Sequence, residues 1–140
     1  MPLDYAKQAL VFYVAQDFDQ AVRSDVQQLI NKLNASRVWS IAPPSFIDEI
    51  DENGFEVVGG VIEIYSALQP NMLPFDVDSK NLDEVEELIG AIRELSEKGS
   101  LSFEFKLDAT YVGSIEDGVV DRVLKEGLLV PWRDNLNGKN

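Results

Sequence analysis

Residues 9–15 (ALVFYVA) form an unbroken run of apolar side chains between two polar residues, Gln8 and Gln16. A short apolar run with polar ends is typical of a central β-strand that is covered on both faces. We therefore expect residues 9–15 to lie at the centre of a sheet.

After this strand the spacing of apolar residues changes to three and four, which predicts an amphipathic helix. Asp17 and Gln20 approximate a capping box at its start, and Asn34 is a suitable last residue. The inward face of this first helix is predicted to consist of Phe18, Ala21, Val22, Val26, Leu29, Ile30 and Leu33.

Two further helices are predicted by the same spacing. The second starts at Asn81 as its cap, has Glu84 at the capping-box position and ends at Gly99. The third runs from about Asp117 to Glu126. The segment between the first two helices ends in a loop over residues 67–81, which has no regular period and contains two prolines.

The remaining apolar segments are short and extended. Strands are predicted over residues 37–41, 46–50, 55–66, 101–107 and 111–115, with a hairpin turn at residues 51–54. Within the strand over residues 55–66, Glu56 and Glu63 have opposite parity and cannot both face water in a regular strand. A bulge at Gly59 and Gly60 would resolve this conflict and turn Phe55 inward.

These elements predict an α+β fold, in which three amphipathic helices pack against a mostly antiparallel sheet of about five strands. A more parallel α/β sandwich is the alternative. The 140 residues, 45% of them hydrophobic, suffice for one globular domain with a single core, and residues 135–140 are expected to fray.

The charge of −13 is unevenly distributed. Residues 38–92 carry one basic and twelve acidic side chains, whereas residues 1–37 are neutral and residues 93–140 carry a net −2. An anionic block of this kind favours a basic protein partner and disfavours nucleic acid, whose phosphates it would repel.

The chain has no histidine and no cysteine, so catalytic sites and metal sites built on those residues are excluded. It also lacks a phosphate-binding glycine motif. Asp76, Asp78 and Glu87 have the spacing of EF-hand positions 1, 3 and 12, but Asn81 stands where that loop needs glycine. We expect a protein that is not an enzyme and has no cofactor or metal.

The candidate binding surface consists of carboxylates from the acidic block and of apolar residues near them. Either these carboxylates form a recognition surface, or they only keep a solvated turn and a helix start soluble. The alternative for the apolar anchors is that they are loop residues packed into the core. The candidates are Asp48, Glu49, Asp51, Glu52, Glu56, Glu63, Asp83, Glu84, Glu86 and Glu87, with Met72, Leu73 and Phe75 as apolar anchors.

In size, charge and mixed α/β character the chain resembles the small acidic immunity proteins of bacterial toxin–immunity systems. The resemblance implies a cytoplasmic inhibitor that covers a basic partner, such as a nuclease toxin, without reacting with it. It extends over the whole chain but matches no motif, so it assigns no residue a role.

The alternative is a ligand-binding or regulatory α+β module whose acidity serves only solubility. It predicts a pocket near Gly59 and Gly60. In both interpretations the protein is cytoplasmic and touches no membrane, because residues 1–8 contain Asp4 and Lys7 and lead into only seven apolar residues.

Overall fold

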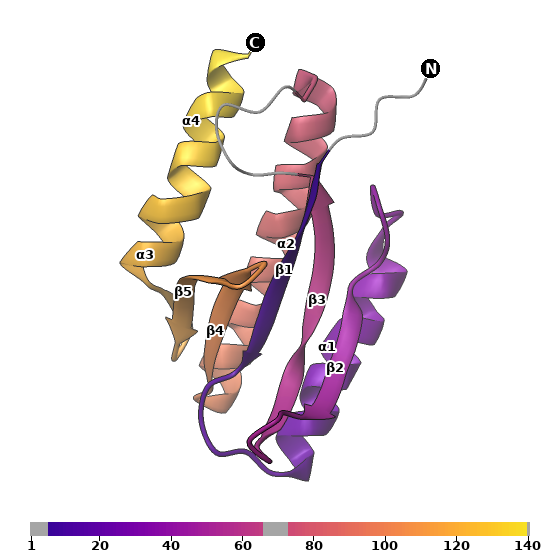
Figure 1. Cartoon of the computed structure of the whole chain (residues 1–140), viewed down its shortest axis with the longest axis vertical. Coiled ribbons are helices and arrows are strands. Elements are labelled where there is room, and N and C mark those ends of the chain that lie inside the picture. The colour runs from indigo at the N-terminus through magenta and orange to yellow at the C-terminus, as the bar shows by residue number, and fades with distance from the viewer. Residues whose placement is uncertain (1–5, 66–72, 140) are drawn as a thin grey trace.

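The computed structural model of the chain describes residues 6–65 and 73–139. In this part of the chain, one antiparallel sheet of six strands packs against three helical segments, so the predicted α+β class is confirmed (Figure 1). The elements are β1 (Lys7–Val14), α1 (Gln20–Ser36), β2 (Ser45–Ile50), β3 (Glu56–Tyr65), α2 (Phe75–Gly99), β4 (Ser102–Leu107), β5 (Thr110–Glu116), β6 (Val119–Val120), α3 (Arg122–Leu124), a π-helical turn η1 (Lys125–Leu129) and α4 (Val130–Gly138).

The strands lie in the order β2-β3-β1-β4-β5-β6, and each pairs antiparallel with its neighbours. The first four strands, with α1 after β1 and α2 after β3, have the βαββαβ arrangement of the ferredoxin-like fold. β1 therefore lies in the middle of the sheet, as its sequence predicts.

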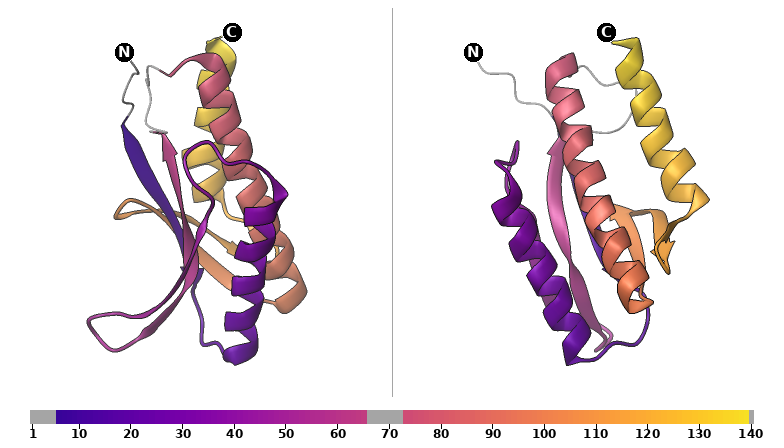
Figure 2. Two further views of the ribbon diagram at one scale, coloured as in Figure 1. Left: turned by 90° about the vertical axis from the view of Figure 1, so that its right-hand side faces the viewer. Right: turned by 180° about the vertical axis from the view of Figure 1, so that it is seen from behind.

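The described helices all lie on one side of the sheet (Figure 2). The prediction that β1 is covered on both faces is therefore wrong for the described residues. Leu10, Phe12 and Val14 are buried on the helical side, whereas Val11 and Tyr13, on the other side, are partly exposed. The Phe12 ring meets Phe103 of β4 edge to face, with the centroids 6.1 Å apart. We call the side without described helices the open face.

The predicted bulge at Gly59 and Gly60 is wrong, because both glycines continue regular ladders with β1 and with β2. Unbroken alternation places Glu56 on the helical side, where its carboxylate pairs with Arg23 of α1. A side chain placed on Gly60 would meet Ile30 and the Phe12 ring at 2.7 Å, so this position is closed by core residues.

α2 starts six residues before the predicted cap, directly after Pro74, which lies at the N-cap position. Asn81 is buried inside the helix, and its Oδ1 accepts a hydrogen bond from the Tyr65 backbone N–H at 2.8 Å. Residues 37–41 form no strand; within them, Trp39 is buried and donates its indole N–H to the Leu33 carbonyl.

The third predicted helix starts later than expected. Asp117 and Gly118 both have positive φ and form a two-residue hairpin turn between β5 and β6, so Val119–Val120 is a strand. The helix begins after Asp121, whose carboxylate accepts the Leu124 N–H, and it continues through Gly127 as a π-helical turn. Residues 135–138 belong to α4, and Leu136 is buried.

Candidate protein-interaction surface

The acidic segments predicted to form one surface lie in different parts of the molecule. The turn between β2 and β3 and the first turns of α2 are at opposite ends of the long axis (Figure 1). Glu63 is exposed on the open face of β3, opposite Ala9 in the ladder. The structure therefore does not bring these segments together.

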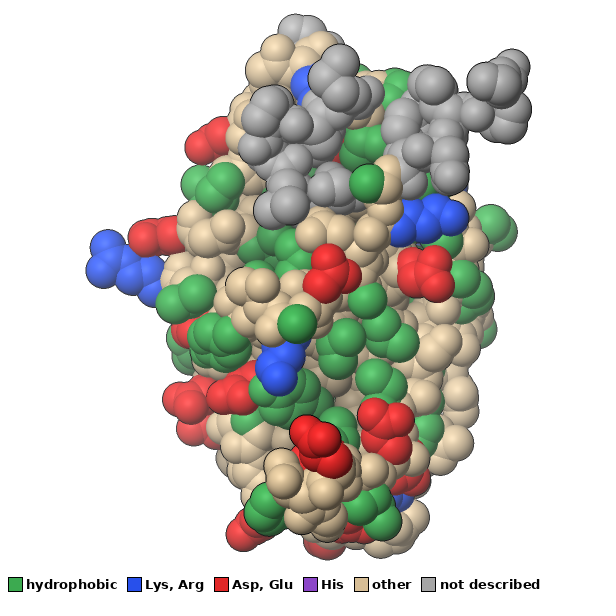
Figure 3. Space-filling view, viewed as in Figure 1, with side chains coloured by type: hydrophobic (Ala, Val, Ile, Leu, Met, Phe, Trp, Pro, Cys, Tyr) green, Lys and Arg blue, Asp and Glu red, His purple; other side chains and the backbone are tan. Residues whose placement is uncertain are grey.

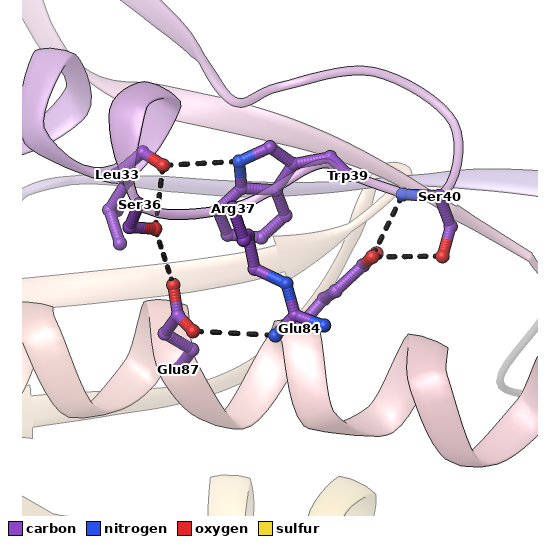
Figure 4. Close-up of polar contacts among 7 residues, drawn as sticks. All are labelled: Leu33, Ser36, Arg37, Trp39, Ser40, Glu84 and Glu87. Atoms are coloured by element: carbon purple, nitrogen blue, oxygen red, sulfur yellow. Dashed lines mark hydrogen bonds and ion pairs between the residues drawn. The ribbon is translucent and has the colours of Figure 1, made fainter.

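Two of the α2 carboxylates hold the connection between α1 and β2 (Figure 4). Glu84 is buried, and its Oε2 accepts hydrogen bonds from the backbone N–H and the hydroxyl of Ser40, both at 2.8 Å. Glu87 accepts a hydrogen bond from the Ser36 hydroxyl and pairs with Arg37 at 3.3 Å. Both carboxylates are bound within the fold.

The other candidates on and before α2 differ in exposure. Glu86 and Asp83 are both exposed, and Glu86 pairs with Arg133 of α4. Phe75 is also exposed, whereas Leu73 is buried. Met72 lies outside the described residues.

The end of the β2–β3 hairpin next to its turn is fastened to α1 by Arg23. Its guanidinium pairs with Asp48 of β2 at 3.2 Å and with Glu56 of β3 at 2.8 Å, and lies over the Phe18 ring. Desolvation opposes the charge of Arg23, but the hydrogen bond to Glu56 and the negative charge of Asp48 outweigh it and raise the pKa of the guanidinium. Asp48 and Glu56 thus orient the hairpin.

The turn of this hairpin is fixed by its own hydrogen bonds. The Asp51 carboxylate accepts the backbone N–H groups of Asn53 and Phe55 at 2.9 and 3.0 Å. Gly54 has a φ of +84°, which favours glycine at this position. The predicted turn over residues 51–54 is confirmed, and its tip has a defined shape.

Two large apolar side chains are exposed at this tip. Ile50 and Phe55, which flank the turn, are each 70% exposed, and the neighbouring Glu49, Asp51 and Glu52 are also exposed. The tip stands away from the helical layer (Figure 2). We call these five residues the hairpin tip.

The sequence prediction placed Phe55 in the core and therefore missed it as a candidate anchor. The sequence does contain a pattern that places Phe55 outside the core. Regular alternation back from Ile64 and Ile62 assigns residues 60, 58 and 56 to the helical side, and so places Phe55 on the other side.

Comparison with family models, curated proteins and solved structures finds no match for the chain. The candidate surface therefore rests on its geometry alone.

Neither a metal site nor a membrane span is found among the described residues. In residues 6–65 and 73–139 no three potential ligands gather around a common point, and no helix is both long and apolar enough to cross a bilayer. Asp76, Asp78 and Glu87, which have EF-hand spacing, lie on the single helix α2. Eleven residues of helix span about 16 Å, so the three carboxylates cannot surround one ion.

The open face carries apolar side chains between single charged ones (Figure 3). On it, the Tyr13 hydroxyl donates a hydrogen bond to Glu104 at 2.8 Å, and the Lys106 ammonium lies 5.5 Å from the Tyr13 ring centre. Burial, the hydrogen bond to Glu104 and its negative charge together raise the pKa of Tyr13 from 10.0 to about 12.

We expect Tyr13 to ionise later than an unperturbed tyrosine. Because its pKa is raised in the folded state, its contribution to stability is complete below pH 10 and is lost as the pH rises towards 12. Ultraviolet absorbance during an alkaline titration measures this ionisation, and the Tyr13→Phe variant should lack the late transition. A transition unchanged by that substitution would contradict the assignment.

A groove of about 610 Å³ lies between α1 and α2. Its apolar lining includes Leu29 and Leu33 of α1 and Leu95 of α2. Its charged lining consists of two lysines and two carboxylates, which are Lys32, Lys98, Asp25 and Glu94. At Gly60, near which a pocket is expected, Ile30 and the Phe12 ring occupy the space next to the backbone.

Proposed function

We propose that the chain is a non-catalytic binding protein of the immunity or inhibitor type, and that its hairpin tip covers a basic partner protein such as a nuclease toxin. The observation that carries the proposal is the exposure of Ile50 and Phe55 within a group of exposed carboxylates. Exposed apolar groups that are surrounded by polar residues mark protein-interaction sites.

The contacts of the acidic residues support the hairpin tip as the binding surface. Glu84 and Glu87 are bound within the fold, and Asp48 and Glu56 hold the hairpin to α1. Glu49 and Glu52 have no such role among residues 6–65 and 73–139, and both are exposed at the tip. Their charges would speed the encounter with a basic protein, while the apolar anchors would supply most of the affinity.

The pre-formed turn also favours binding. Because Asp51 and Gly54 already fix the backbone of the tip, little conformational entropy remains to be lost when a partner docks. The ion pairs of Arg23 with Asp48 and Glu56 also hold the strands next to the turn in place.

The test uses the purified product of the neighbouring reading frame, with affinity measured by calorimetry. We expect Phe55→Ala to weaken binding about tenfold or more, because truncating a central aromatic anchor costs at least about 1.4 kcal/mol. The double variant Glu49→Lys with Glu52→Lys should slow association about tenfold at low salt, which stopped-flow mixing measures.

The matched control is Asp83→Lys with Asp134→Lys, which makes the same change in net charge at two exposed sites away from the hairpin. This control should bind as the unaltered protein does. If the neighbouring product does not bind, or if hairpin and control variants bind equally, the proposal is wrong.

One observation favours the second candidate, a ligand-binding or regulatory module. The α1–α2 groove is large enough for a small molecule, and it combines leucine side chains with two lysines and two carboxylates, which suits an apolar ligand with a polar head group. Thermal-shift screening with short fatty acids tests this candidate. Stabilisation that is lost in Lys32→Ala would support it, and no stabilisation would contradict it.

A further inference from the structure

The strand β2 lies at one edge of the sheet and pairs only with β3 among the described residues. The Asp51 N–H donates to the Phe55 carbonyl at 2.8 Å, which marks this pair as hydrogen-bonded. Since such pairs alternate along an antiparallel ladder, Ile47 and Glu49 also bond to β3. The alternate residues of β2 point their N–H and C=O groups to the free edge of the sheet. These residues are Phe46, Asp48 and Ile50.

Negative charge is the one usual protection that this edge has among the described residues. Proteins protect edge strands with charged side chains, proline, bulges or very short length, and of these features β2 has only the charges of Asp48 and Glu49. β2 has six residues, contains neither lysine nor proline, and follows a regular register with β3. By contrast, the opposite edge is formed by β6, which has only two residues.

The charge of the edge selects the kind of strand it can accept. If two copies of the chain paired through β2, Asp48, Glu49, Asp51 and Glu52 of each copy would be brought against the same residues of the other. Like charges that face each other across strands are destabilising. An extended segment rich in lysine or arginine meets no such repulsion, because its side chains would lie beside these carboxylates.

We propose that β2 accepts an extended basic segment of a partner protein as an additional strand of the sheet. In this arrangement backbone hydrogen bonds to Phe46, Asp48 and Ile50 provide affinity, while alternating side chains provide selectivity. Basic side chains lie beside Glu49, and apolar ones beside Ile50 and Phe46. The inference rests on the proposed function, since it describes how a partner held at the hairpin tip continues along the edge.

The first test uses a peptide of seven alternating lysine and valine residues and a copy with every backbone nitrogen methylated. Both peptides carry the same side chains, but the methylated peptide cannot donate hydrogen bonds to a strand. We expect the unmethylated peptide to bind about tenfold or more tightly than its copy. In hydrogen-exchange NMR it should slow exchange at the amides of Phe46, Asp48 and Ile50, which exchange fast in the free protein.

The second test changes the protein. Ile50→Pro removes an N–H that points to the free edge, whereas Ile50→Thr keeps this N–H and removes apolar surface. The proline variant should lose the protection of Asp48 by the peptide, and the threonine variant should retain it. Circular dichroism checks that both variants fold, and the peptide pair stands as a separate measurement if the proline variant does not.

Strand addition is overturned if both peptides bind equally, if neither binds, or if binding leaves exchange at Phe46, Asp48 and Ile50 unchanged. Equal binding that still depends on Glu49 and Glu52 would overturn strand addition while leaving the proposed function in place. Failure of the proposed function is seen separately, in the calorimetric test with the neighbouring gene product.

Discussion

Replacing Gly59 with alanine is expected to destabilise the fold by about 3 kcal/mol or more. A Cβ atom on Gly59 would lie 1.9 Å from the carbonyl oxygen of Phe12 and 2.7 Å from the Cα of Tyr13. Both are backbone atoms of β1, so relief of the clash requires β1 and β3 to separate. Urea unfolding followed by circular dichroism measures the loss.

Gly90 provides the matched control, because it lies inside α2 and a Cβ there would meet no atom within 4 Å. Gly90→Ala should stabilise the protein by about 0.5–1 kcal/mol, since alanine favours the helix over the unfolded chain. If Gly59→Ala unfolds at the same urea concentration as the unaltered protein, the close approach of β1 and β3 is wrong.

The second large effect is expected for Asp78→Ala, which should cost about 3 kcal/mol. Asp78 is fully buried on α2, where its carboxylate accepts hydrogen bonds from the Trp132 indole N–H at 2.7 Å and from the Lys139 ammonium at 2.8 Å. Its removal leaves the buried indole N–H without this acceptor and takes away one negative charge beside the Lys139 ammonium. Urea unfolding measures the cost, and Trp132 fluorescence reports whether α4 loosens from α2.

Asp83→Ala is the control for this variant, because Asp83 lies on the same helix and is exposed. Its effect should stay within about 0.5 kcal/mol. Asp78→Asn should be less damaging than Asp78→Ala, because an amide oxygen still accepts the indole N–H. Equal stability of the Asp78→Ala and Asp83→Ala variants would contradict the structural role of this carboxylate.

The elements with a regular local pattern could be predicted from the sequence. The alternation over residues 101–107 and the helical stripe from Val22 to Leu33 each needed only near neighbours to be interpreted, and both elements are present. The unbroken apolar run of β1 likewise located the centre of the sheet.

The errors arise where a distant residue changes the meaning of a local pattern. The alternation rule predicts a bulge because it assumes that Glu56 must face water. In the structure Glu56 faces the helices, where Arg23, 33 positions earlier in the chain, pairs with it. Asn81 resembled a helix cap, but its amide binds the backbone of Tyr65. Asp117 and Gly118 were an overlooked signal, since Asp-Gly is a frequent two-residue hairpin turn.

The candidate site was predictable in part. The acidic turn over residues 51–54 is predicted from its local sequence, and its hydrogen bonds confirm that it is a turn. Which carboxylates remain exposed was not predictable, because Glu84 and Glu87 find their partners, Ser40 and Arg37, only when α2 packs beside the chain that leaves α1.

The central place of β1 also governs the order in which the chain can assemble during synthesis. β1 is made first, but its two neighbours, β3 and β4, end at residues 65 and 107. The ribosome must therefore release most of the chain before the apolar run in β1 has a strand on either side. Contacts between residues so far apart in sequence form slowly, and unpaired apolar strands are prone to aggregate. We expect chaperones that bind extended apolar segments to bind β1 until β4 has been synthesised.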